Sequence, residues 1–221
     1  MELPVYVSVV FILTTIATLY FLYKASNNSK MLLLICSLWI LVQGVIAYTG
    51  FYTVINTLPP RFALLILPAF VLIAVLFNTV KGKSFIDTFD QKWLTYLHVV
   101  RVPVELVLFW LYAAKYVPEL MTFEGRNFDI LSGLSAPVIA YLAFNKNLNR
   151  KILLFWNFIC LALLFNIVIN AILAAPSAFQ MQAFDQPNVG VFYFPFVWLP
   201  CFIVPVVLFS HLACIRQIIK K

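Results

Sequence analysis

Three ionisable side chains lie within one of the most apolar stretches of the sequence, WLTYLHVVRVPVELVLFWLY at residues 93–112. They are His98, Arg101 and Glu105. On a helix, which turns about 100° per residue, all three share one face with Tyr112. Buried carboxylates and imidazoles can carry protons, and an arginine can hold an anionic group. The stretch therefore predicts a site for a small anionic or protonatable solute.

Placing these charges inside a membrane would be costly. Counting about 1.5 Å per residue from Trp93 puts Arg101 about 12 Å deep and Glu105 about 18 Å deep, near the midplane. Each costs about 2.5–3.5 kcal/mol there unless it is paired or hydrated. The helix face that carries His98, Arg101 and Glu105, the ionisable stripe, must therefore face the bundle interior or a water-filled cavity. Two interpretations remain: a structural Arg101–Glu105 ion pair that fixes helix register, or a site for a substrate, an ion or a proton.

Other polar side chains reach similar depths on neighbouring apolar segments. His211 lies about 7 Å from the basic end of the last segment, which matches the depth of His98, so the two histidines can face each other. Gln43 lies near the midplane and can reach Glu105, and Asn157 lies at the level of the histidines. We expect the following residues to bind a ligand: His98, Arg101, Glu105, Tyr112, Gln43, Asn157 and His211.

A second polar group is expected toward the opposite side of the membrane. The segment TFEGRNFDILSG leads into an apolar stretch in which Asp129 shares a helix face with Ser132, Gly133, Ala136 and Ala140. Such a face of small residues permits close approach of two helices. We predict an outer polar cluster of Glu124, Arg126, Asn127, Asp129, Asn166 and Asn170. Ordinary hydrogen bonds between packed helices are the alternative interpretation for the asparagines.

The elements that must position these groups follow from the composition. Of the 221 residues, 64% are hydrophobic and 10% are charged, which is typical of a membrane protein and not of a soluble domain. Apolar runs near the roughly 20 residues needed to span a bilayer recur along the chain. We predict one all-α integral membrane domain, residues 1–221, with seven transmembrane helices: 3–23, 31–52, 62–80, 93–116, 127–144, 152–174 and 190–215.

The last predicted span contains three prolines, Pro195, Pro200 and Pro205. Each proline removes a backbone donor and clashes with the preceding turn, so this helix should be kinked or locally unwound. Inside a membrane, the carbonyls that such a break frees need partners within the protein.

The distribution of basic residues predicts the orientation. Eleven Lys and Arg residues fall in the first, third and fifth loops and the C-terminal tail, whereas three fall on the opposite side. The excess places the N-terminus outside and the C-terminus in the cytoplasm, and in a bacterial cell the membrane would be the inner one. The basic residues form no patch, so we expect no nucleic-acid partner. The first span has no basic leader and should be retained.

The sequence contains no common motif for a metal or a cofactor. There are only two histidines, without HExxH or HxxxH spacing, and the four cysteines lie within predicted spans and not in CxxC pairs. We therefore expect no metal, no cofactor and no disulfide. A retinal pigment would need a lysine in the middle of the last span, and residues 190–219 contain no lysine.

Three functions remain. In the first, which we favour, the protein is a transporter or conduit: Arg101 holds an anionic group, Glu105 carries charge or a proton, and the two histidines form a gate or relay. In the second, the protein is a receptor, a sensor or an assembly subunit whose buried charges are structural. In the third, it is an intramembrane enzyme acting on a lipid-like substrate, with Glu105 or Asp129 as acid and base. The balance favours a protein that is not an enzyme, and the sequence identifies no protein partner.

Overall fold

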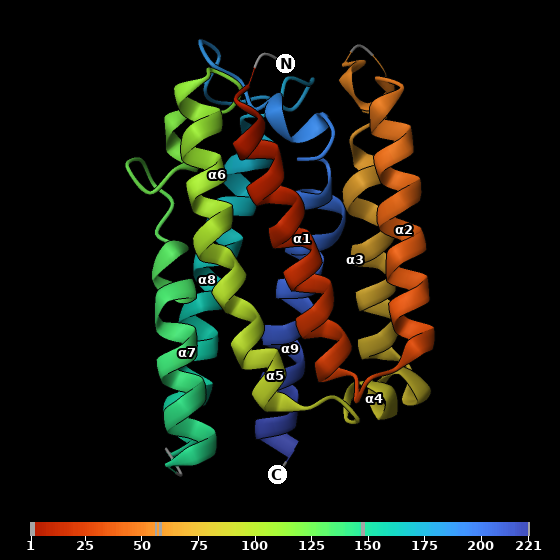
Figure 1. Cartoon of the computed structure of the whole chain (residues 1–221), viewed down its shortest axis with the longest axis vertical. Helices are drawn as coiled ribbons and strands as arrows, with labels where there is room; N and C mark the ends of the chain where they lie inside the picture. The colour runs from red at the N-terminus through yellow and green to blue at the C-terminus, as the bar shows by residue number, and fades with distance from the viewer. Residues whose placement is uncertain (1–2, 56, 58, 147–148, 221) are drawn as a thin grey trace.

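The computed structural model describes residues 3–55, 57, 59–146 and 149–220. These residues are 74% helical and contain no strand, which confirms the predicted all-α class. The helices run up and down one long axis, with the N-terminus at one end of the bundle and the C-terminus at the other (Figure 1). The α-helices are α1 Val5–Ala25, α2 Lys30–Tyr48, α3 Ala63–Asn78, α4 Val80–Ile86, α5 Gln91–Leu97, α6 Arg101–Ala113, α7 Ile130–Asn145, α8 Arg150–Leu173 and α9 Val204–Lys220.

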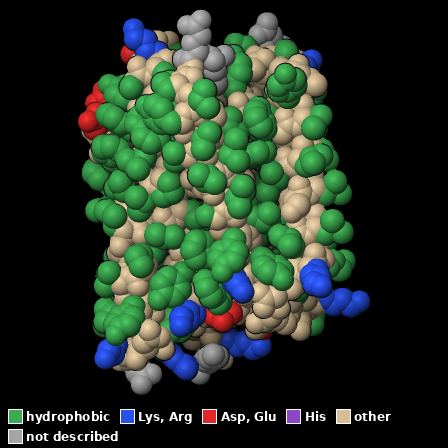
Figure 2. Space-filling model, in the orientation of Figure 1, with side chains coloured by type: hydrophobic (Ala, Val, Ile, Leu, Met, Phe, Trp, Pro, Cys, Tyr) green, Lys and Arg blue, Asp and Glu red, His purple; other side chains and the backbone are tan. Residues whose placement is uncertain are grey.

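Several helical segments are long and apolar enough to cross a membrane. In the described part of the chain they are five: Val5–Ala25, Lys30–Tyr48, Gln91–Ala113, Arg150–Leu173 and Leu199–Lys220. Helices α3 and α4, bent by 99° relative to each other, would together make a sixth, and α7 is apolar but shorter. Figure 2 shows hydrophobic side chains over the middle of the molecule, with Lys and Arg gathered at the end where the C-terminus lies. These features are compatible with a membrane protein.

The predicted span that carries the ionisable stripe is one continuous helical segment with a tight turn inside it. Helix α5 passes into a 3-10 turn, His98–Val100, and then into α6. Pro103 explains this turn, because it has no backbone N–H to donate to the carbonyl of Val99 in the α-helical pattern. The turn places His98 and Arg101 at the centre of the bundle, where α5 and α6 contact α1, α7 and α9.

The last predicted span, 190–215, is regular only in its second half. A π-helical turn, Leu199–Ile203, precedes α9. Pro205 cannot donate to the carbonyl of Cys201, and the indole Nε1 of Trp39 on α2 donates to that carbonyl instead, at 2.9 Å. Trp198 donates in the same way to the carbonyl of Ile40, at 2.9 Å. The two indoles thus join α2 to the irregular region, and the indole of Trp39 satisfies the carbonyl that Pro205 frees.

Helix α7 begins later than the predicted span 127–144, at Ile130. In Figure 1 it starts well below the upper ends of α6 and α8, and an irregular segment leads down to it. Asn127 is fully buried there, and Asp129 is 5% exposed. Irregular backbone at this depth is tolerated only when protein surrounds it. The late start therefore carries Asp129 into the bundle interior.

The predicted face of small residues on α7 is buried as expected, and it brings α7 close to α6. Its members are Ser132, Gly133, Ala136 and Ala140. A Cβ atom on Gly133 would lie 2.8 Å from Cγ2 and 2.9 Å from the backbone nitrogen of Val102. Only a glycine fits this contact, which sets the distance between Asp129 and Arg101.

Candidate functional site

Arg101 forms an ion pair deep inside the bundle, but its partner is not Glu105. Its Nε atom lies 2.8 Å from Oδ2 of Asp129, and the two side chains are 3% and 7% exposed. The structural Arg101–Glu105 ion pair, one of the two interpretations of the sequence, is therefore wrong. Arg101 stands at the first position of α6, and Asp129 stands immediately before α7. The ion pair consequently joins two helices, whereas the predicted pair would have lain along one.

The remaining nitrogens of the guanidinium bind two further helices. One Nη atom lies 3.2 Å from Nε2 of His211 on α9, and the other donates to the carbonyl of Cys160 on α8 at 3.3 Å. Because an arginine can only donate, Nε2 of His211 must accept. The proton of the neutral ring then lies on Nδ1, which donates to Oδ1 of Asn157 at 2.9 Å. We call Arg101, Asp129, His211 and Asn157 the ion-pair layer.

His98 packs against this layer through its ring. The imidazoles of His98 and His211 stack with centroids 3.8 Å apart and an interplanar angle of 16°, and Trp156 contacts both. The prediction that the two histidines face each other is confirmed. Both ring nitrogens of His98 are buried and have no hydrogen-bond partner among the described residues.

Glu105 lies one helical turn beyond Arg101 and is held by an amide. Its Oε1 atom accepts from Nδ2 of Asn127 at 2.6 Å. Oδ1 of Asn127 in turn accepts from the backbone N–H of Asp129 at 3.0 Å. One asparagine thus binds the carboxylate of Glu105 and the backbone of Asp129 in the same part of the bundle. The second oxygen of Glu105, Oε2, is buried without a hydrogen-bond partner in the described part of the chain.

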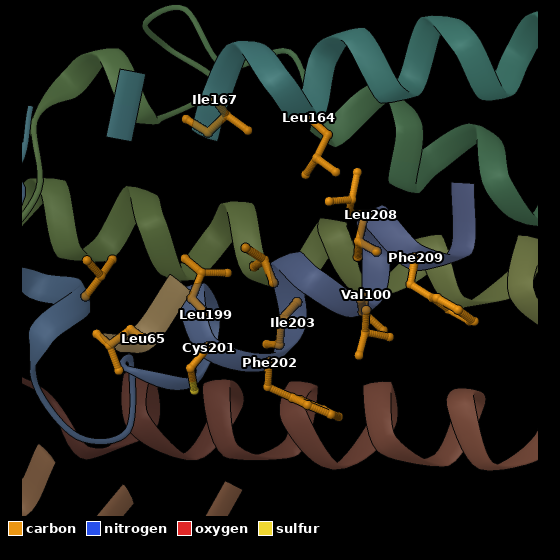
Figure 3. Packing of buried hydrophobic residues seen from close by; sticks show 14 of the residues in the cluster. Leu65, Val100, Leu164, Ile167, Leu199, Cys201, Phe202, Ile203, Leu208 and Phe209 are labelled. Carbon is orange, nitrogen blue, oxygen red and sulfur yellow. The ribbon is translucent and has the colours of Figure 1, made fainter. Parts of the chain in front are cut away.

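Both carboxylates line a small cavity of about 90 Å³, which we call the carboxylate pocket. Its walls come mainly from α3, α6, α8 and the helical segment Leu199–Lys220, with further residues from the connecting segments, and they are apolar apart from Glu105, Asp129 and Asn188. Figure 3 shows Leu164 and Ile167 pointing inward from α8, with Leu65 and Leu199 of the same lining on the opposite side.

Each polar residue of the carboxylate pocket keeps an acceptor oxygen without a partner. These atoms are Oε2 of Glu105, Oδ1 of Asp129 and Oδ1 of Asn188, all buried and unpaired among the described residues. The orientation of Asn188 follows from its Nδ2 atom, which donates to the carbonyl of Ala171 at 3.1 Å. Buried acceptors are nearly always satisfied in folded proteins, so three among the residues of one pocket call for a donor from outside the described residues.

The pocket has an inner and an outer end. On α8, Cys160 contacts the ion-pair layer and Ala171 contacts Asn188, and eleven residues of helix separate the two levels by about 16 Å. The carboxylates therefore occupy the inner end, and Asn188 lies toward the outer end. In the described chain, α3 and α8 each contact α9 but are not closely packed against each other. The outer part of the pocket runs between them.

Some residues expected at the site lie elsewhere. Oε1 of Gln43 accepts from the hydroxyl of Tyr52 at 2.6 Å, so Gln43 pairs with Tyr52 and not with Glu105. Tyr112 is partly exposed at the outer end of α6 and is not part of the pocket lining. These two expectations are therefore corrected.

The predicted outer polar cluster divides into two groups. Asn127 and Asp129 join the buried site, whereas Glu124 and Arg126 are exposed. Asn166 donates to the backbone carbonyl of Arg126 at 2.9 Å, and Asn170 donates to Asn166 at 3.2 Å, both near the surface. The single cluster was therefore wrong, because the late start of α7 separates its members in depth.

Sequence reasoning missed Asn188 altogether. It follows Pro187 in a polar loop, DQPN, where an asparagine has no feature that distinguishes a pocket residue from an ordinary turn residue. Its place in the lining of the cavity, and the contact of its amide with α8, are visible only in the structure.

Comparison with known proteins gives a family and no function. No curated protein and no solved structure matches the chain. A family model matches residues 58–219, a range that contains the ion-pair layer, both carboxylates and Asn188. The chain belongs to the family described as a domain of unknown function, DUF8737.

Proposed function

We propose that the protein crosses a membrane seven times, with its N-terminus outside and its C-terminus in the cytoplasm. The passes would be α1, α2, α3, the α5–α6 segment, α7, α8 and the final segment from Leu199. Although α7 is short, the irregular segment before it, in which Asn127 and Asp129 are buried, would extend its pass toward the outer side. The orientation is supported by the eleven basic residues on the side of the C-terminus, against three on the other.

Within this bundle, we infer that the carboxylate pocket binds an amphiphilic, lipid-like small molecule. The unpaired Oε2 atom of Glu105, at the inner end of an otherwise apolar cavity, carries this inference. Leaving a buried polar group unsatisfied costs about 1–3 kcal/mol, and more for a charged one. A ligand with a polar head and an apolar tail would satisfy the oxygen and fill the space between α3 and α8.

Binding of a solute remains the basis of the transporter hypothesis, but the roles of the residues change. Arg101 is not assigned an anionic solute, because its guanidinium already forms an ion pair with Asp129 and contacts His211 and the carbonyl of Cys160. Glu105 is the residue that would contact the ligand. The ion-pair layer lies on the cytoplasmic side of the pocket and would have to separate for a solute to pass, so it would act as the inner gate.

An enzyme acting on a lipid is a second candidate. Two carboxylates beside an apolar pocket could transfer a proton to and from a bound lipid, which favours this candidate over a purely structural role for the charges. Incubation of the purified protein with membrane lipid, followed by mass spectrometry, separates the two. A new product that depends on Glu105 would favour the enzyme, and an unchanged lipid would favour binding alone.

Thermal unfolding of the detergent-purified protein with a panel of amphiphiles tests the proposed binding. Ala171 lines the pocket and Ala162 is exposed on the same helix, so Ala171→Phe fills the pocket and Ala162→Phe is its matched control. A ligand that binds only the folded protein raises its midpoint. We expect this rise in the wild type and in A162F but not in A171F. If no amphiphile raises the midpoint, or if A171F responds equally, the pocket is not a binding site.

A further inference from the structure

We propose that the head group bound at the inner end of the carboxylate pocket is a primary ammonium, so that the ligand is a single-chain lipophilic amine. This inference rests on the proposed binding function and names the chemical class of its ligand.

The inner end of the pocket offers acceptors that the described residues do not use. Oε2 of Glu105 and Oδ1 of Asp129 are both free and buried. The nearby donor, Nδ2 of Asn127, is already shared between Oε1 of Glu105 and the carbonyl of Met121. Arg101 directs its nitrogens to Asp129, His211 and the carbonyl of Cys160. A head group that carries its own donors would therefore satisfy both oxygens.

Charge complementarity favours a cation. Glu105 and Asp129 bring two carboxylates to this part of the bundle, and Arg101 is the one basic side chain paired with either of them in the described chain. A carboxylate or phosphate head would meet two like charges and an arginine that is already engaged. A neutral alcohol would bring one donor to two acceptors, whereas an ammonium brings three donors and a compensating charge.

The dimensions of the cavity favour a small head group. Its volume is about 90 Å³ over the whole lining. A primary ammonium is compact and carries three N–H donors, whereas a trimethylammonium head is bulkier and has no N–H to donate. The rest of an alkyl chain would follow the apolar lining outward between α3 and α8.

Four probes with the same twelve-carbon chain test the head group: dodecylamine, dodecanol, dodecanoate and dodecyltrimethylammonium. Midpoints of thermal unfolding and binding isotherms are measured in a nonionic detergent for the wild type, Glu105→Gln, Ala171→Phe and Ala162→Phe. We expect only dodecylamine to stabilise the wild type and A162F. Its affinity should fall at least about tenfold in E105Q, because a charge-assisted hydrogen bond is lost, and binding should be abolished in A171F.

The outcomes separate this inference from the proposed function. If dodecanol or dodecanoate stabilises the wild type but not A171F, while dodecylamine does not, the pocket binds amphiphiles and the ammonium assignment is overturned. If none of the four distinguishes A171F from A162F, both proposals fail. Equal binding of dodecylamine to wild type and E105Q also overturns the assignment. If E105Q does not fold, A171F and A162F still decide the result without altering a carboxylate.

Discussion

Asp129 and Glu105 are neighbouring buried carboxylates with different partners. Their exposed fractions are 5% and 2%, and Asn127 binds to both residues. Asp129 has an arginine within 2.8 Å, whereas Glu105 has one amide and a free oxygen. Burial alone therefore does not separate a structural charge from one available to a ligand. The number of ion-pair and hydrogen-bond partners of each carboxylate makes that distinction.

The same comparison predicts opposite responses to mutation. Removing one partner of a buried ion pair leaves an uncompensated charge and is strongly destabilising. Neutralising a buried carboxylate that has no counter-ion relieves a cost that the fold already bears. The ion-pair layer should consequently dominate stability, and Glu105 should dominate binding.

The largest effect is expected for Arg101→Ala. The substitution leaves Asp129 without its counter-ion and removes a donor from His211 and from the carbonyl of Cys160. We expect the free energy of unfolding to fall by about 3–5 kcal/mol. Equilibrium unfolding in detergent measures the change.

Arg126→Ala is the matched control for this prediction, because the side chain of Arg126 is exposed. Its effect should stay within about 0.5 kcal/mol. If R101A costs no more stability than R126A, the ion-pair layer does not hold the bundle together. The proposed difference in role between Asp129 and Glu105 is then wrong.

A smaller loss is expected for Gly133→Ala, which alters the spacing of the pair without removing a charge. The added Cβ would approach the backbone nitrogen of Val102 within 2.9 Å, so α7 must shift away from α6. Overpacking of this kind costs about 1–3 kcal/mol. The exposed neighbour Leu134, changed to Ala, should cost less than G133A in the same unfolding experiment. A neutral G133A would mean that the close approach does not position Asp129.

Much of the fold could be predicted because it follows from local physical rules. Apolar length predicts helices that can cross a membrane, and the cost of an unpaired charge predicts that the stripe on α5 and α6 faces inward. Depth along each helix correctly brought His98 and His211 together. The prolines of the last predicted span predicted its irregular region, although not that Trp39 would satisfy the carbonyl of Cys201.

The partners within the site could not be predicted, because depth and face on one helix do not fix the neighbouring helix. Asp129 was placed near the outer surface on the assumption that its helix begins at the membrane boundary. The irregular segment before α7 instead carries it inward to Arg101. Gln43 and Glu105 were matched by depth alone, and the lateral packing pairs Gln43 with Tyr52.

Glu105→Gln should have a much smaller effect on stability than Arg101→Ala. The oxygen of the glutamine can still accept from Asn127, and the new amide nitrogen can donate toward the free oxygen of Asp129. We expect the free energy of unfolding to change by less than about 1 kcal/mol or to rise. The exposed Glu124→Gln is the control in the same unfolding measurement. A loss of the size expected for R101A would show that Glu105 is part of the structural pairing.

A third carboxylate, Asp87, extends the comparison to the end of the bundle where the C-terminus lies. It follows α4 and accepts hydrogen bonds from Arg216 at 3.0 Å to each of its oxygens and from Lys220 at 2.7 Å. The side chains of Asp87 and Arg216 are 20% and 25% exposed. Asp87 thus has more ionic partners than Asp129, but its side chain is more exposed to solvent.

The smallest effect is therefore expected for Asp87→Asn, and it should depend on pH. Exposed ion pairs contribute about 0.2–1 kcal/mol, so D87N should lose no more than this at pH 7. Hydrogen bonds from Lys220 and Arg216 lower the pKa of Asp87 below its usual value. A lowered pKa means that this stabilisation is present above about pH 4 and is lost as the pH falls through the lowered value. Unfolding of wild type and D87N should accordingly converge in acid. A difference that persists there, or that equals the loss in R101A, would show that the number of ionic partners outweighs burial.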